Sequence, residues 1–407
     1  MRSIFIFNES FGANNYGIGR YISQLKKIST YSNLKIVMIQ FSSYETDLKV
    51  EEEEESIVYH IPLSAYQDSS RKEKYYLNTL TLLDSMWTIN SDTIFQFNYF
   101  EHSTIIEWVK EKYPYNKIIF TVHFMNWMFP IKGNTSYFKN IINSEPSSLK
   151  NDIEKKIFES FKKEVKILNM VDKVICLSQY SLKLLIEDYK VPSSSIRLVV
   201  NGLTDEYEML SKKYKRLLRK KYYYNSSDKI ILYVGRIDIN KGVKELITSF
   251  ERVLKFAPNS KLVIIGKSYC DVLDNLFIQY GSRIFFTGYL NRAIIKELYQ
   301  ISDIGVLPSF VEQCSYVGIE MMMFGLPIVG TTGTGLSEMI DNGVNGYKVR
   351  LNEVDASVSL NTQDLADNIV SAIDNSSFLS KNSRDYYEAK YQIFSMIDKM
   401  NSIILDL

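Results

Sequence analysis

Short apolar segments alternate with longer amphipathic segments along the first half of the chain. Continuous apolar runs separated by segments of helical length predict a parallel sheet that is covered on both faces. The predicted strands are Ser3–Phe7, Leu34–Ile39, Ser56–Ile61, Thr93–Phe97, Lys117–Val122, Lys173–Leu177 and Ile196–Val200. The helices between them include Ile18–Lys27, Thr104–Lys112, Glu154–Asn169 and Ser181–Tyr189.

The second half of the chain repeats this alternation, which predicts a second doubly wound α/β domain. Its predicted strands are Lys229–Val234, Lys261–Ile265, Arg283–Thr287, Ile304–Leu307 and Pro327–Gly330. Its predicted helices are Gly242–Phe256, Val272–Tyr280, Arg292–Gln300, Gly318–Phe324 and Gln363–Asp374. The fold class is therefore α/β, with two Rossmann-like parallel-sheet domains.

A polar and basic stretch, Asp205–Tyr224, lies between the two halves and has turn residues on both sides. We place the domain boundary there, with a first domain over 1–204 and a second over 205–384. One further helix, Asp385–Leu405 within the segment 385–407, follows the second domain and has no strand after it.

Two runs of like charge stand out along the chain. The acids Glu51–Glu55 precede a predicted strand, and we interpret them as a solvated loop or helix end. The stretch Lys212–Lys221 predicts a basic helix with few apolar positions. A solvated surface helix is the favoured interpretation of it, and peripheral contact with an anionic membrane surface is the alternative.

Composition narrows the class of protein. A length of 407 residues suits two domains, and a formal net charge of +1 argues against nucleic acid as a partner. The cysteines Cys176, Cys270 and Cys314 are far apart, which fits a reducing, cytoplasmic compartment better than a disulfide framework. The apolar run Ile4–Phe7 is too short for a signal peptide, and no apolar stretch is long enough to predict a transmembrane helix.

The strongest local signal is Tyr233–Gly242, with the sequence YVGRIDINKG. It follows a buried strand and precedes a helix, the position at which open α/β sheets bind ligands. Gly235 lets a ligand approach the backbone, and Arg236 and Lys241 bring two cations to one point. Two cations there suit a diphosphate, whose negative charge grows as its bond to another group breaks.

A second signal is Pro308–Glu320, which runs from a strand end into a helix. Backbone N–H groups around Cys314–Val317 would lie at the start of that helix, a natural anion site. Glu312 and Glu320 are eight residues apart across this transition. Their carboxylates can accept paired hydrogen bonds from vicinal hydroxyls, which sugars and ribose both offer.

In this order the two motifs resemble the family 4 retaining glycosyltransferases. Gly-Arg-x4-Lys-Gly after a strand is followed about 75 residues later by Glu-x7-Glu, and the run Phe324–Gly330 with Gly333, Glu338 and Asn345-Gly346 is also similar. The resemblance implies the GT-B fold, with two domains facing a cleft and the last helix packing back on the first domain. It also implies hexosyl transfer, with retention, from a nucleotide diphosphate sugar to a glycan, lipid-linked or other surface-glycoconjugate acceptor.

The resemblance also implies roles for individual residues. Arg236 and Lys241 would hold the diphosphate, Glu312 would contact the transferred sugar, and Glu320 would contact the ribose. Backbone amides of Cys314, Ser315 and Tyr316 would form the family's cradle, where this chain has Gln313 and Ser315 in place of the usual glycines.

The first half resembles the family at two strand ends. Within Phe11–Arg20, Gly17 and Gly19 match the family's glycine-rich turn, whereas Tyr16 replaces a glycine. His123 follows the strand Lys117–Val122, where the family often has a histidine near the sugar. The aromatic stretch Phe124–Pro130 either shapes the acceptor side or is a buried loop, and His60 and His102 are interpreted as structural.

No metal or cofactor is expected. The chain contains no Asp-x-Asp pair and no His/Cys ligand cluster, and Arg236 and Lys241 supply positive charge for the leaving diphosphate. The alternative functions are a sugar-nucleotide epimerase on the same scaffold and a non-catalytic sugar-nucleotide-binding protein. A dinucleotide oxidoreductase fits less well, because the glycine-rich turn after the first strand lacks the full Gly-x-Gly-x-x-Gly.

Overall fold

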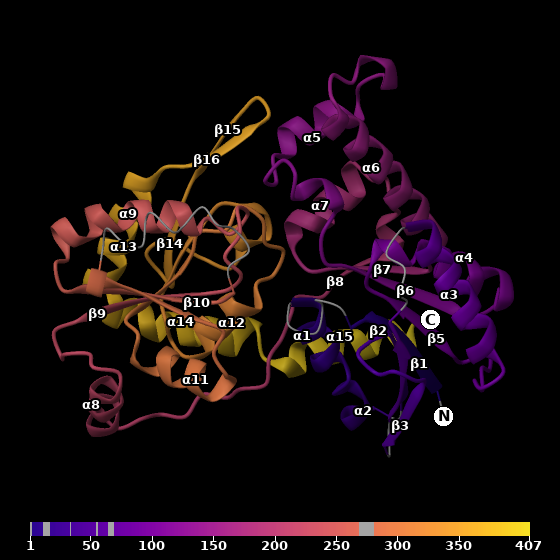
Figure 1. Cartoon of the computed structure of the whole chain (residues 1–407), viewed down its shortest axis with the longest axis horizontal. Coiled ribbons are helices and arrows are strands. Elements are labelled where there is room, and N and C mark those ends of the chain that lie inside the picture. The colour runs from indigo at the N-terminus through magenta and orange to yellow at the C-terminus, as the bar shows by residue number, and fades with distance from the viewer. Residues whose placement is uncertain (1, 11–16, 33, 54–55, 64–68, 268–280) are drawn as a thin grey trace. The chain divides into compact units, whose positions relative to one another are not determined.

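The computed structural model describes residues 2–10, 17–32, 34–53, 56–63, 69–267 and 281–407 (Figure 1). The chain divides into two compact units. The first unit contains Met1–Met125, Lys150–Val200 and Phe394–Leu407, and the second contains Asn126–Leu149 and Asn201–Ile393. This division differs from the predicted one at three places, because Asn126–Leu149 and residues 201–204 group with the second unit and the segment 385–393 stays with it.

An eight-stranded sheet forms the centre of the first unit, in the order β3-β4-β2-β1-β5-β6-β7-β8. Every neighbouring pair is parallel except β3 and β4. The strand order reverses between β1 and β5, and Ile4–Phe7 of β1 lie in the core. The strands are β1 Arg2–Glu9, β2 Leu34–Ser43, β3 Lys49–Glu53, β4 Ser56–Pro62, β5 Ile94–Phe97, β6 Lys117–Val122, β7 Lys173–Cys176 and β8 Ile196–Leu198.

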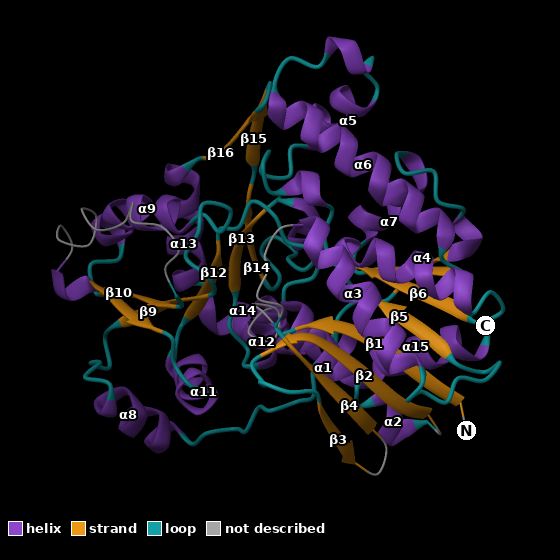
Figure 2. Ribbon diagram, turned by 45° about the vertical axis from the view of Figure 1, so that its right-hand side comes forward, coloured by secondary structure: helices purple, strands orange, loops and turns teal. Residues whose placement is uncertain are grey.

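Helices cover this sheet, and α3, α4 and α6 pack side by side above it in Figure 2. Asn151 and Ser178 cap α6 and α7, each accepting a hydrogen bond from a backbone N–H of the first turn. The helices are α1 Gly17–Leu25, α2 Ile28–Tyr31, α3 Ser69–Asp84, η1 Phe100–His102, α4 Ser103–Lys112, α6 Asp152–Met170, α7 Gln179–Glu187, η4 Ser193–Ser195 and α15 Ile393–Leu405.

The second unit contains a six-stranded parallel sheet in the order β11-β10-β9-β12-β13-β14. Numbered within the unit this order is 3-2-1-4-5-6, which is the Rossmann order, and it reverses between β9 and β12. The fold class predicted from the sequence is confirmed. The strands are β9 Lys229–Val234, β10 Ser260–Ile265, β11 Ile284–Gly288, β12 Ile304–Leu307, β13 Ile328–Thr331 and β14 Gly346–Val349, with a separate hairpin of β15 Leu351–Val354 and β16 Ser357–Leu360.

Helices lie on both faces of the second sheet. Figure 1 shows α9 and α13 on one side of β9 and β10 and α11 on the other, and α8 packs against α11. The helices are η2 Asn126–Met128, α5 Thr135–Ile142, η3 Pro146–Ser148, α8 Lys212–Lys221, α9 Val243–Phe256, η6 Gly281–Arg283, α11 Arg292–Ile301, α12 Tyr316–Met323, η7 Thr334–Glu338, α13 Thr362–Asp374 and α14 Ser376–Lys390.

The interpretation of Glu51–Glu55 as a loop or helix end was wrong for its described part. Residues Lys49–Glu53 form the edge strand β3, with Glu51 opposite Val58 of β4. Glu51 forms an ion pair with Lys49 at 2.8 Å and contacts His60 at 3.1 Å. Pairing with β4 outweighs the low strand propensity of glutamate, because an edge strand leaves these side chains in water.

The predicted final helix Asp385–Leu405 is in fact two helices, α14 and α15. The break lies at Tyr391 and Gln392, where the chain pairs with Leu203. The N–H of Leu203 donates to the carbonyl of Tyr391, and the N–H of Ile393 donates to the carbonyl of Leu203, both at 2.9 Å. These backbone groups are therefore not available to continue one helix.

The strands β14, β15 and β16 were not predicted. Three expectations fall on residues outside the described ranges. They are the helix Val272–Tyr280, the thiol of Cys270 and the turn Phe11–Tyr16.

Candidate active site

Two of the predicted motifs lie next to each other in the second unit. The loop 235–242 follows β9 and the loop 308–315 follows β12, and β9 and β12 are neighbouring parallel strands. Strand order reverses between them, so their carboxyl ends border the crevice in which open α/β sheets bind ligands. The N–H of Phe310 donates to the carbonyl of Asn240 at 2.9 Å and joins the two loops.

Glycines allow this close approach of the two loops. Gly242 has φ +64°, and a β-carbon there would lie 2.0 Å from the carbonyl oxygen of Pro308. Gly235 has φ +152°, and a β-carbon at the neighbouring Gly266 would lie 1.8 Å from the carbonyl oxygen of Gly235. These positions require glycine because of both backbone conformation and space.

The structure brings Lys241 and Glu312 together as an ion pair. Their side chains are 19% and 17% exposed, so both are within reach of a ligand yet mostly shielded from water. Arg236 lies in the same loop, more exposed, with its guanidinium 3.5 Å from the carboxylate of Asp238. One cation of the predicted pair is thus held by a predicted sugar-binding carboxylate, which the spacing along the chain did not indicate.

The helix α12 begins at Tyr316, two residues before its predicted start, and Ser315 is its cap. The Ser315 hydroxyl accepts a hydrogen bond from the N–H of Gly318 at 3.3 Å. The carbonyl of Cys314 accepts one from the Asn201 amide at 2.7 Å. Burial raises the pKa of the Cys314 thiol to about 12, so this thiol stays protonated at neutral pH. Cys314 therefore contributes its backbone and not a thiolate, and Tyr316 follows as the first residue of the helix.

Glu320 is buried on α12 and held by two side chains from α11. Arg292 donates to one carboxylate oxygen at 2.6 Å, and the Tyr299 hydroxyl donates to the other at 3.0 Å. Arg292 also contacts Glu206, which forms an ion pair with Lys296 at 2.6 Å. Burial lowers the pKa of Arg292, but Glu320 and Glu206 outweigh it and raise that pKa.

Sequence reasoning named Glu320 but missed the residues that orient it. Arg292, Tyr299 and Glu206 lie far from Glu320 along the chain and belong to no motif. Only the packing of α11 near α12 brings them together. The carboxylate of Glu320 is consequently fixed in direction before any ligand arrives.

A segment from the first half of the sequence reaches the Glu312 loop. The Gln313 amide donates to the sulfur of Met128 at 3.1 Å, and the ammonium of Lys132 lies 4.3 Å from the centre of the Phe310 ring. Met128 belongs to the predicted aromatic stretch Phe124–Pro130. That part of the stretch is therefore buried against the loop that carries Glu312.

In the first unit, His123 follows β6 and is half-buried. Its Nε2 lies 3.1 Å from the Asn98 amide oxygen, and its ring meets Tyr21 edge-on at 4.7 Å. Burial lowers the pKa of His123 to about 3, so the imidazole is neutral near pH 7. Gly17 and Gly19 lie in the first turn of α1, and the residues just before them are outside the described part of the chain.

A second polar cluster in the first unit was missed. Glu9 ends β1, and its carboxylate lies 3.2 Å from Nε2 of His102 and accepts a hydrogen bond from the Tyr76 hydroxyl. Burial raises the pKa of Glu9, but His102, Lys72 and Tyr76 outweigh it and lower that pKa to about 2. The cluster lies where the strand order reverses between β1 and β5, and the buried ring of His102 agrees with the structural role expected for it.

The described residues offer neither a metal-binding cluster nor a membrane-spanning helix. They contain no group of three or more His, Cys, Asp or Glu side chains placed to hold a metal ion. Among the same residues, no helix combines the length and apolar character needed to cross a membrane.

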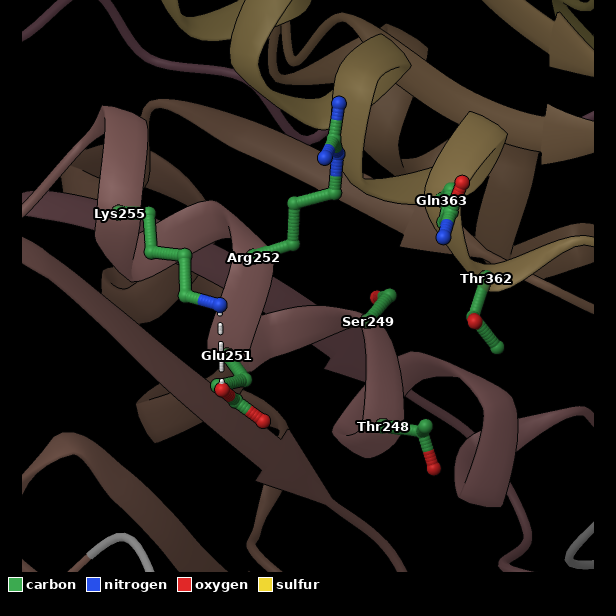
Figure 3. A pocket seen from close by; sticks show the side chains of 7 residues that line it. All are labelled: Thr248, Ser249, Glu251, Arg252, Lys255, Thr362 and Gln363. Carbon is green, nitrogen blue, oxygen red and sulfur yellow. Dashed lines mark ion pairs between the residues drawn. The ribbon is translucent and has the colours of Figure 1, made fainter.

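A pocket lies elsewhere on the second unit, between α9 and α13 (Figure 3). Charged and hydroxyl side chains line it, and Lys255 and Glu251 on its wall form an ion pair at 3.3 Å. Arg252 is bound by Asp367 of α13 at 2.6 Å. None of the predicted site residues lines this pocket.

Comparison with known proteins relates part of the chain to a protein family. Residues 214–386 match the model of the family described as Glycosyl transferases group 1. Over this stretch of its second half, the chain is similar to the group 1 glycosyltransferases. The match confirms the resemblance to glycosyltransferases found in the sequence.

The similar proteins agree with the family and the fold. An uncharacterized glycosyltransferase of Methanocaldococcus jannaschii is 34% identical over 166 residues, which span 40% of this chain and 42% of that relative. Sucrose-phosphate synthase from Thermosynechococcus elongatus has a TM-score of 0.77 at 18% identity, over 100% of this chain and 99% of that one. HepE of Anabaena, solved with UDP and glucose, has a TM-score of 0.71 at 16% identity, with both chains fully covered. The chain thus has the GT-B fold.

Proposed function

We propose that this glycosyltransferase moves a hexosyl group from a nucleotide diphosphate sugar to an acceptor hydroxyl, with retention and without a metal ion. One observation carries the proposal. The loop with Arg236 and Lys241 lies at the reversal of strand order between β9 and β12, joined to the loop that leads into α12. Cations and a helix start at such a point suit a diphosphate. The similar HepE structure, a complex with UDP and glucose, supports the same class of donor here.

The ion pair between Lys241 and Glu312 suggests how the donor enters. A diphosphate competes with the Glu312 carboxylate for the lysine. Once Lys241 has turned to the phosphate, Glu312 is available to accept hydrogen bonds from hydroxyls of the transferred sugar. Glu320, already oriented by Arg292 and Tyr299, accepts hydrogen bonds from the ribose.

In the proposed reaction, the bond from the anomeric carbon to the diphosphate oxygen breaks, and the acceptor oxygen bonds to the same face of that carbon. The acceptor proton passes to the departing diphosphate. Arg236, Lys241 and the amides at Cys314–Tyr316 stabilise the charge that develops there. The neutral imidazole of His123 is assigned to hydrogen bonding near the sugar and not to proton transfer.

The acceptor in this proposal is a glycan, a lipid-linked sugar or another surface glycoconjugate, in a cytoplasmic or peripheral membrane setting. Two other functions make different predictions for one assay. A sugar-nucleotide epimerase turns over the donor without any acceptor. A non-catalytic binding protein binds the donor and releases no nucleotide diphosphate.

The test begins with a thermal-shift screen of UDP-, GDP- and ADP-sugars, because a bound donor stabilises the folded chain. With the donor so found, Lys241→Ala should reduce acceptor-dependent release of nucleotide diphosphate on the order of 100-fold or more. Lys244→Ala, three residues further on and exposed on α9, is the matched control and should keep the wild-type rate. Equal rates in both variants would remove the diphosphate assignment, and strict inhibition by EDTA would overturn the metal-free mechanism.

A further inference from the structure

Most of the cations of the basic helix α8 have no acidic partner among the described residues. Its ten residues, KKYKRLLRKK, carry seven cations and no acid, although the net charge of the whole chain is only +1. Leu218 is the residue of α8 that is buried, and it anchors the helix to the second unit. Figures 1 and 2 show α8 beside α11, away from the strands of its sheet.

Three of the seven cations have a place within the fold of the second unit. Arg219 donates to the carboxylate of Asp303 at 2.8 Å, and Lys221 forms an ion pair with Glu297. Lys215 is half-buried on the inner side of the helix, where burial lowers its pKa. Arg219 and Lys221 thus attach α8 to the unit, and Lys215 is partly covered by it.

The remaining cations are Lys212, Lys213, Arg216 and Lys220. All four are exposed, and within the described part of the chain no acid lies within ion-pair distance of them. Lys213, Arg216 and Lys220 follow one another at spacings of three and four, so they share one face of the helix and repel one another. Lys212 and Lys213 also lie in the first turn, where the helix dipole disfavours positive charge.

Apolar side chains lie among these cations. Leu217 is on the same face as Lys213 and Lys220 and is 52% exposed. Tyr214 at the side of the helix is 49% exposed, and Met209 and Tyr223, just before and after α8, are 86% and 94% exposed. A face that combines unpaired cations with protruding leucine, methionine and tyrosine is typical of helices that lie on the surface of an anionic bilayer.

We propose that this face, Lys213, Arg216, Leu217 and Lys220 with Met209 and Tyr223 beside it, docks the enzyme on an anionic lipid bilayer. The lysines and the arginine attract the negative surface, and the apolar side chains enter the interface between headgroups and acyl chains. Charge alone would suit either lipid or RNA, and the protruding Leu217 on the same helix face favours lipid, because an apolar side chain gains from entering a bilayer interface.

The experiment is co-sedimentation of the full chain with vesicles of phosphatidylcholine, with and without phosphatidylglycerol. We expect the chain to pellet with the anionic vesicles only, and less at high salt, because screening shortens the reach of the charges. The triple variant Lys213→Glu/Arg216→Glu/Lys220→Glu should weaken binding on the order of 100-fold or more, since each basic residue contributes about fivefold. Leu217→Ser should weaken it less.

The matched control is Lys155→Glu/Lys156→Glu/Lys163→Glu on α6, which changes the net charge by the same amount at exposed positions of the first unit. It should bind vesicles like the wild-type chain, and thermal unfolding should show that both variants fold. Equal loss in the two variants, or equal pelleting with neutral vesicles, would overturn the proposal. A band-shift assay with RNA completes the test, since RNA binding lost in the α8 variant with vesicle binding unchanged would also overturn it. None of these results depends on sugar transfer.

Discussion

Individual residues decide how close the two loops of the donor site can come. Gly242 combines a left-handed backbone with contact against the carbonyl of Pro308, and the hydrogen bond from Phe310 to Asn240 holds the same two loops. At Glu320, three residues from elsewhere in the sequence supply the hydrogen bonds and charges around one carboxylate. The site therefore depends on single contacts as much as on its motifs.

Gly242→Ala should destabilise the second unit by more than backbone strain alone. Gly343→Ala is the matched control, because Gly343 has a similar φ of +73° with nothing within 4 Å of an added β-carbon. Strain at such a position costs about 1–2 kcal/mol. We expect denaturant unfolding to give a larger loss for Gly242→Ala, together with weaker donor binding. Similar losses and unchanged binding would show that the loops tolerate a shift.

The imidazole of His123 should stay neutral between about pH 5 and 8. Its pKa of about 3 in the folded chain lies below the unfolded value of about 6.5, so between these values the unfolded chain binds more protons. The free energy of unfolding should therefore fall as pH decreases through this window, and His123→Gln should reduce that slope. NMR titration of the ring checks the value, and a midpoint near pH 6.5 would contradict it.

At the scale of elements, helices and strands form where the local sequence pattern predicts them, unless pairing with a distant part of the chain favours another structure. The strand β9 and the helix α8 were predicted to the residue, because a continuous apolar run marks the strand and a run of cations between turn residues marks the helix. Expectations failed where distant parts of the chain pair, as at β3 against β4 and at the break between α14 and α15. The partner in both cases lies outside the window over which periodicity is measured.

The helix α15 should be essential to the first unit, although it comes at the end of the chain. Met396, Met400 and Ile404 are almost fully buried, and the guanidinium of Arg2 donates to the carbonyl of Ile404. Met400→Ala should cost about 2–5 kcal/mol. Lys399→Ala, one residue earlier and exposed, should change stability by less than about 0.5 kcal/mol. Hydrogen exchange of the amides in β1 and β5 measures the stability of the first unit in both variants. Equal protection of those amides in the two variants would argue against an essential role for α15.

For the molecule as a whole, the chain passes between the two units more than once. Asn126–Leu149 belongs to the second unit although it interrupts the sequence of the first, and Phe394–Leu407 returns to the first. The segment Asn126–Leu149 begins three residues after His123 and contacts the loop of Glu312.

A donor bound as proposed should slow hydrogen exchange more in the second unit than in the first. Nucleotide diphosphate should slow hydrogen exchange in the loops 235–242 and 308–320 and raise the unfolding free energy of the second unit. At a ligand concentration of 100 times the dissociation constant the gain is about 2.7 kcal/mol. Exchange at β1 and β5 of the first unit serves as the internal control. Protection of β1 and β5 without protection of the two loops would place the nucleotide elsewhere.

The sequence by itself determined the fold class, most strands and helices, and the motifs at the ends of β9 and β12. These features depend on periodicity and on residues close together in the chain, so a local pattern is enough to specify them. Only the tertiary structure decided that Lys241 faces Glu312, that Arg292 and Tyr299 hold Glu320, and that Glu9 meets His102. Such contacts join residues far apart in sequence, and they exist because the sheet order and helix packing bring those side chains together.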